Sequence, residues 1–170
     1  MASNRHLGRI IILQSLYEYE FRQLAKDQSV DLNAIIAKNI LPYEKALGDV
    51  EFVYDLANRV KDHFKELDDI LRPLAPEWPI ESLSAIDRNI LRMGLYELAE
   101  CRDKVPTKVA INEAVELAKA FGAENSSRFV NGVLGSAYKK LGINESSESS
   151  NDRTEKTGKS ESSGSSSETI

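Results

Sequence analysis

The basic residues near the start of the chain are the first candidates for chemistry. Arg5 and Arg9 are four residues apart in NRHLGRIIILQ, so a helix would place them on one face. His6 is next to Arg5, and Tyr17 follows Arg9 by just over two helical turns. Arginines at a helix start can bind phosphate, and an exposed ring can stack on a base, as on single-stranded RNA surfaces. From these residues alone, a solvated helix start with Tyr17 in the core is the commoner explanation.

The loop GAENSSR is a second candidate site, because it precedes the last predicted helix. Asn125, Ser126 and Arg128 would place hydrogen-bond donors near the positive end of the helix dipole, which suits phosphate or base contacts. Capping of the helix by Asn125 or Ser126 would account for one of these residues without a ligand.

Signatures of common enzyme classes are absent from the sequence. His6 and His63 are the two histidines and Cys101 is the single cysteine, so no zinc-ligand spacing exists. Neither a glycine-rich loop after a strand nor a Gly-x-Ser-x-Gly motif occurs. We therefore expect no catalysis, no cofactor and no metal.

The net charge of −5 is unevenly distributed along the 170 residues. Residues 145–170 hold six acids and three bases, which leaves a charge of −2 for residues 1–144. Such a body has no global basic field, so nucleic-acid binding would require a local patch and help from a partner. The single cysteine and the lack of both a signal peptide and an apolar run of about 20 residues predict a cytoplasmic protein outside the membrane.

Apolar periodicity predicts helices throughout the body, without strand-like alternation or hairpin signals. Residues 49–72 would form one long amphipathic helix. Gly122 would end the predicted helix at residues 108–122 in a left-handed cap. Ser84 and Asp87 have the spacing of a capping box. The predicted fold is an all-α, compact bundle of six to seven helices. The predicted helices cover residues 5–25, 32–40, 49–72, 84–103, 108–122 and 127–141.

Small residues in the last two predicted helices favour close helix packing. They include Ala114 and Ala118, together with Gly132 and Gly135, which are three residues apart. Glycine inside a helix costs up to about 1 kcal/mol relative to alanine, so a packing or contact reason is expected at both glycines.

Residues 145–170 are serine-rich and almost free of apolar side chains. Such a segment cannot bury enough surface to offset the entropy of ordering, so we predict a disordered tail. The predicted organisation is one helical domain at residues 1–144 followed by this tail. A solubilising role for the tail is the simplest interpretation, and a weak regulatory or charge-screening role is the alternative.

Three segments together resemble the NusB family of transcription antitermination factors, as do the length and the all-helical pattern. The resemblance covers residues 5 to about 142 and implies two packed helical subdomains without catalytic activity. The segments are RHLGRIIILQSLYEYEF at the start, IDRNILRMGLYEL from Ile86, and VPTKVAINEAVELAKAFGAENSSRFVNGVLG from Val105.

The resemblance also implies partners. A small-subunit ribosomal protein, called NusE in this context, would form a heterodimer with this chain. The pair would bind the single-stranded boxA element of ribosomal RNA operon transcripts, and with NusA and NusG it would keep RNA polymerase elongating past terminators. Ribosome assembly would also be supported.

Site residues are implied by position in the family. Family members usually carry more arginine at the start, where this chain has Leu7 and Gly8. The partner face would lie on the helix of Asp87, Leu91 and Arg92, beside the connection of residues 73–78. The RNA-binding residues would be Arg5, His6, Arg9, Tyr17, Asn125, Ser126 and Arg128.

Two alternatives remain open at this point. The first is an accessory domain of an RNA methyltransferase, which would require a downstream Rossmann-like catalytic domain where this sequence has its serine-rich tail. The second is a helical interaction protein without RNA binding, which the sparse arginines at the start would favour.

Overall fold

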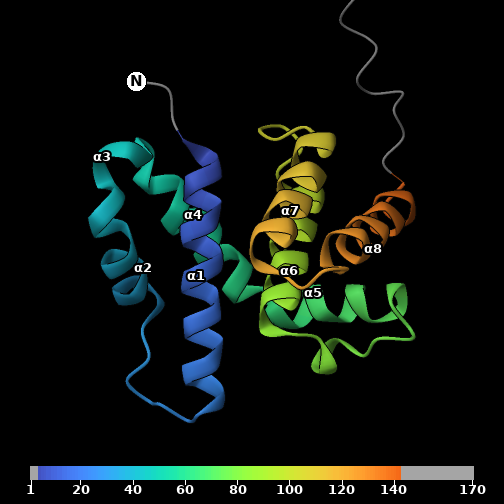
Figure 1. Ribbon diagram of the computed structural model, residues 1–170, viewed down its shortest axis with the longest axis horizontal. Helices are drawn as coiled ribbons and strands as arrows, with labels where there is room; N and C mark the ends of the chain where they lie inside the picture. Colours follow the sequence, from blue (N-terminus) through green and yellow to red (C-terminus); the bar gives the residue numbers. More distant parts are fainter. Residues whose placement is uncertain (1–3, 143–170) are drawn as a thin grey trace, which may run out of the picture.

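The computed structural model describes residues 4–142, and every regular element in that range is helical (Figure 1). This confirms the all-α prediction. None of these helices is long and apolar enough to span a membrane. The predicted tail at residues 145–170 lies outside the described residues. The α-helices are α1 (Arg5–Leu24), α2 (Leu32–Ile40), α3 (Glu44–Leu47), α4 (Val50–Asp62), α5 (Phe64–Leu71), α6 (Ala85–Glu100), α7 (Thr107–Phe121) and α8 (Ser126–Lys140).

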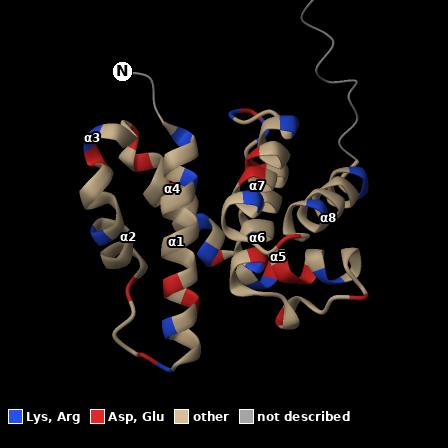
Figure 2. Ribbon diagram, viewed as in Figure 1, with Lys and Arg blue, Asp and Glu red and all other residues tan. Residues whose placement is uncertain are grey.

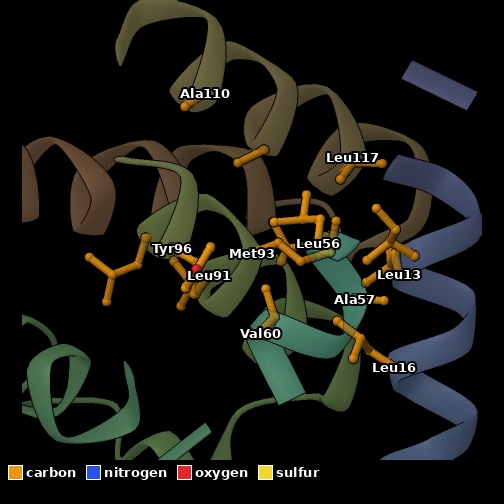
Figure 3. Close-up of a cluster of buried hydrophobic side chains, with 14 of the residues drawn as sticks. Leu13, Leu16, Leu56, Ala57, Val60, Leu91, Met93, Tyr96, Ala110 and Leu117 are labelled. Carbon is orange, nitrogen blue, oxygen red and sulfur yellow. The ribbon is translucent and has the colours of Figure 1, made fainter. Parts of the chain in front are cut away.

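The helices form two groups around one continuous core. Helices α1 to α4 lie on one side in Figure 1 and α5 to α8 on the other, and α6 packs against α1, α4 and α7. Figure 3 shows the core side chains that meet between these helices. Leu13 and Leu16 come from α1, Leu56 and Val60 from α4, and Met93 from α6. The elements that carry the candidate site residues are therefore held together by apolar burial.

Local capping fixes several helix starts where the sequence predicts them. The Asn4 side chain accepts a hydrogen bond from the backbone N–H of Leu7 at 3.1 Å, which caps α1. The Ser84 hydroxyl accepts one from the backbone N–H of Asp87, also at 3.1 Å, at the start of α6. The Ser84 contact confirms the predicted spacing with Asp87, and both contacts join residues three positions apart, so local sequence is enough to form them.

The prediction of one long helix after Asp49 is wrong, because the chain bends at His63 between α4 and α5. At His63 the backbone has φ −112° and ψ 17°, and the ring nitrogen Nδ1 lies 2.6 Å from the carbonyl oxygen of Arg59. Neither proline nor glycine marks the bend, and the apolar stripe continues through it. The described range therefore contains seven α-helices of eight or more residues, in agreement with the predicted six to seven, together with the four-residue helix α3.

The glycines act differently from the predictions. Gly122 has φ −85° and ψ −175°, so the predicted left-handed cap is wrong. A Cβ at Gly122 would lie 2.5 Å from that of Ser126, so close approach explains this glycine. A Cβ at Gly132 or Gly135 would meet no atom within 4 Å, so neither glycine serves close packing. Gly94 does, because a Cβ there would lie 2.7 Å from Leu134 Cδ1.

Candidate nucleic-acid interface

Arg5 and His6 are exposed at the start of α1, but each already contacts another residue. The Arg5 side chain is 41% exposed, and its guanidinium lies 3.6 Å from Asp49 and over the Phe52 ring. His6 Nδ1 lies 2.8 Å from a carboxylate oxygen of Glu113 on α7. Both side chains remain accessible to a ligand, so their role in RNA binding stays a prediction.

Arg9 is buried, and its guanidinium does not share an exposed edge with that of Arg5. The Arg9 side chain is only 4% exposed and donates two hydrogen bonds to Glu97 of α6, at 2.8 and 2.7 Å. Burial alone would lower the pKa of Arg9, but hydrogen bonding to Glu97 and the charges of Glu97 and Glu113 hold that pKa above its ordinary value. We therefore correct the predicted RNA-binding set by assigning Arg9 to the interior.

Exposed aromatic rings line a groove between α1 and the end of α7. Tyr17 is 40% exposed, and Phe21, one turn further along α1, is 64% exposed. Phe121, the last residue of α7, is 40% exposed and lines the same groove, whose volume is about 360 Å³. We call this hollow the aromatic groove; it is lined by Leu13, Gln14, Tyr17, Glu18, Phe21, Asn39, Ile86 and Phe121.

The sequence analysis missed Phe21 and Phe121 as site residues. The position of Phe21, four residues after Tyr17, was the available signal, since a helix places the two on one face. Phe121 carried no such signal, because its place beside α1 depends on tertiary packing. Arg5 lines a different hollow, and a rise of 1.5 Å per residue puts it about 18 Å from Tyr17 along α1.

The segment GAENSSR spans the connection after α7 and the first residues of α8, and it contains exposed and buried residues. Asn125 and Arg128 are exposed, and Asn125 precedes α8 without a capping hydrogen bond from its side chain. Ser126 is buried, and its hydroxyl accepts a hydrogen bond from the backbone N–H of Ala123 at 2.8 Å and donates one to Asp87 at 3.0 Å. Ser126 therefore holds the loop against α6, and Asn125 and Arg128 remain the exposed candidates.

The predicted partner residues on α6 are mostly interior. Leu91 is a core side chain, and the Arg92 guanidinium donates two hydrogen bonds of 2.7 Å to Asp68 of α5. Arg92 also pairs with Glu20 of α1, so its charge is satisfied inside the protein. We therefore correct the assignment of Leu91 and Arg92: in this fold neither presents its side chain at the surface.

Asp87 differs from the other two predicted partner residues because it is only half-buried. One carboxylate oxygen accepts the hydrogen bond from Ser126, while Oδ1 has no hydrogen-bond partner among residues 4–142. Trp78, in the neighbouring connection, is exposed. Because Asp87 Oδ1 is buried, Trp78 is the exposed side chain of the predicted partner face, and Asp87 serves to hold Ser126.

Charge is mixed over the molecule rather than gathered on one face. Figure 2 shows Lys and Arg interspersed with Asp and Glu along the helices. The described range also contains no group of three or more His, Cys, Asp or Glu side chains that could hold a metal ion. Any nucleic-acid contact must therefore be local and must depend on rings and a few cations.

Comparison with known proteins decides the family. The family model described as "NusB family" matches residues 6–139. The chain belongs to the NusB family. The transcription antitermination protein NusB of Dehalococcoides mccartyi (strain CBDB1) is 46% identical over 142 residues, which cover 83% of this chain and 94% of that protein.

Solved NusB structures share the fold. The structure of T. maritima NusB superposes with a TM-score of 0.71 at 31% identity, covering 82% of this chain and 94% of that one. A crystal structure of the antitermination factors NusB and NusE in complex with dsRNA contains a chain that matches with a TM-score of 0.66. At 24% identity, over 80% of this chain and 96% of that one, this second likeness concerns the fold alone.

Proposed function

We propose that this protein is a non-catalytic transcription antitermination factor that binds single-stranded boxA RNA of ribosomal RNA operons as a heterodimer with NusE. Its relatives are transcription antitermination proteins, and the shared fold occurs in a complex of NusB, NusE and dsRNA. NusA, NusG and RNA polymerase would be engaged indirectly through this complex, in the cytoplasm. Binding alone accounts for this role, so it requires neither a catalytic group nor a cofactor.

The observation that carries the proposal is the exposed aromatic groove. Tyr17, Phe21 and Phe121 present ring surface in one hollow, as expected where unstacked bases bind. Phe121 ends α7, and the exposed Asn125 and Arg128 follow it by four and seven residues, so the chain carries an amide and a cation shortly after this ring. The combination of stacking, hydrogen bonding and a phosphate contact is typical of single-stranded RNA recognition.

The partner would complete this surface. Asp87, at the start of α6, is half-buried and accepts the hydrogen bond from Ser126, which holds the segment after α7 against α6. A NusE segment that packs beside the start of α6 would therefore lie next to the hydrogen bond that holds the RNA-facing segment. Because the chain itself offers few free cations here, we expect the heterodimer to bind RNA better than the isolated chain does.

Fluorescence anisotropy with labelled boxA RNA, with and without NusE, tests this proposal. Tyr17→Ala should weaken binding by the heterodimer by about 5- to 150-fold, because stacking contributes roughly 1–3 kcal/mol per base. Tyr43→Ala is the matched control, since Tyr43 is also exposed but lies in the 3₁₀ turn Leu41–Tyr43 outside the groove. Tight, selective binding by the isolated chain would contradict the composite site. Heterodimer formation without RNA binding would support the alternative of a helical interaction protein.

A further inference from the structure

A second groove begins at Arg5, with walls from the start of α1, from α4, and from the end of α6 with the connection to α7. Its volume is about 320 Å³. Ligand sites commonly measure roughly 300–1,000 Å³, so this groove has room for one elongated group. Phe52, Leu56 and Tyr96 provide its apolar surface.

The lining of this second groove contains six carboxylates and three basic groups, so we call the hollow the acidic groove. Three of its carboxylates have an arginine partner: Asp49 is 3.6 Å from Arg5, Asp55 is 2.7 Å from Arg59, and Glu97 is 2.7 Å from Arg9.

The remaining carboxylates give the groove its excess charge. Glu51, Glu100 and Asp103 form no ion pair within residues 4–142, and they face a single similarly unpaired cation, Lys104. The negative end of the α6 dipole lies at Glu100 and adds to this field. An excess of exposed, unpaired carboxylates beside apolar surface is unfavourable for a nucleic-acid phosphate and favourable for a cation with an alkyl stem.

We propose that the acidic groove binds a lysine- or arginine-bearing segment of a protein partner. The alkyl stem would pack on Phe52 and Leu56, while the cation would lie between the unpaired carboxylates. Arg5 shows that the surface accepts such a group, because its guanidinium carbon lies 4.8 Å from the centroid of the Phe52 ring.

A basic segment in this groove would also change the field around Arg5. Residues 1–144 carry a net charge of −2, and the groove places acids next to the predicted RNA-contacting residue Arg5. A bound cationic segment would replace local repulsion of phosphate with attraction. Peptide binding itself needs no RNA, so it is tested without RNA, and its failure would leave the proposed antitermination role standing.

The probe is a short fluorescein-labelled oligolysine peptide, titrated with the full chain at low salt. Anisotropy gives the affinity, and ¹H–¹⁵N NMR shifts locate the site. We expect shifts around Phe52 and Asp103. The triple substitution Glu51→Gln, Glu100→Gln and Asp103→Asn should weaken binding by about five-fold or more, whereas Lys104→Gln should strengthen it, a gain that misfolding cannot produce.

The matched control is a triple variant with the same change of charge elsewhere. Glu44→Gln, Glu66→Gln and Glu77→Gln remove three exposed carboxylates that lie outside the groove and have no ion pair in the described part of the chain. Affinity should change less than about two-fold in this variant. Equal weakening in both triples, or NMR shifts centred elsewhere, would overturn the proposal. Tighter binding of spermidine than of the peptide at the same amides would replace the protein partner with a polyamine.

Discussion

Arg9 and Glu97 form a buried, doubly hydrogen-bonded ion pair that joins α1 to α6 across 88 residues of sequence. The two side chains are 4% and 3% exposed, so water contributes little to stabilising either charge. A pair of this kind fixes the start of α1 against the second group of helices. Its removal tests whether Arg9 is a structural residue or a ligand-binding one.

Arg9→Met should lower the free energy of unfolding by about 3–5 kcal/mol, because it leaves the Glu97 carboxylate buried without its partner. Urea denaturation followed by circular dichroism measures the change. The double variant Arg9→Met with Glu97→Met should cost less than the sum of the single changes. Arg5→Met is the control and should cost less than about 1 kcal/mol, since its pair with Asp49 is partly exposed. A mild effect of Arg9→Met would contradict the structural assignment.

The acid dependence of stability should include a contribution from Glu20. Burial would raise the pKa of Glu20, but the hydrogen bond from Arg88 and the charges of Arg92 and Arg88 lower it below the ordinary glutamate value. The contribution is therefore complete above the ordinary pKa and is lost as the pH falls through the depressed one. Glu20→Gln should cost about 3–5 kcal/mol at neutral pH, and this difference from wild type should shrink on acidification.

Denaturation curves at a series of pH values check this behaviour. Glu66→Gln is the control, because Glu66 is exposed on α5 and forms no ion pair in the described range. Its difference from wild type should stay small, because Glu66 is exposed and unpaired in the described range. A Glu20→Gln difference that is constant with pH would show that the carboxylate does not titrate with a lowered pKa.

Gly94 should tolerate substitution worse than the glycines of α8 do. In Gly94→Ala the new Cβ would lie 2.7 Å from Leu134 Cδ1 and 3.2 Å from the Cβ of Ala114, so side chains between α6, α7 and α8 must move. We expect a loss of about 1–3 kcal/mol, measured by thermal denaturation. Gly132→Ala is the matched control and should raise stability by up to about 1 kcal/mol, because its Cβ meets nothing and alanine favours the helix.

Salt dependence distinguishes a phosphate contact from a general charge effect. Arg128→Ala should reduce the slope of log K against log salt for boxA RNA by about 0.7, the value expected for one contact to a single strand. Lys65→Ala removes an exposed cation on α5 and should leave the slope unchanged. Equal slopes for wild type and Arg128→Ala would remove Arg128 from the predicted RNA contacts.

The structure also changes how the start of α1 should be tested. Substitution of Arg5 and Arg9 together, which the sequence pattern recommends, would combine a surface change with loss of a buried ion pair. Arg5→Ala with Arg128→Ala probes two exposed cations instead. Retained RNA affinity of the heterodimer in this double variant would show that neither cation contributes a contact to the RNA.

The sequence by itself determined the all-α class, a first helix from Arg5 and the start of α6 at Ser84. These features depend on apolar spacing and on hydrogen bonds between residues three positions apart, so the information is local. It could also place Tyr17 and Phe21 on one face of α1, although only Tyr17 was chosen.

Only the tertiary structure decided which polar residues are free. Arg9 is buried against Glu97, and Ser126 is buried against Asp87. Arg92 is buried between Asp68 and Glu20. These partners are distant in sequence, and no local pattern specifies them. The place of Phe121 in the aromatic groove is likewise not specified locally. It depends on the packing of the end of α7 beside α1.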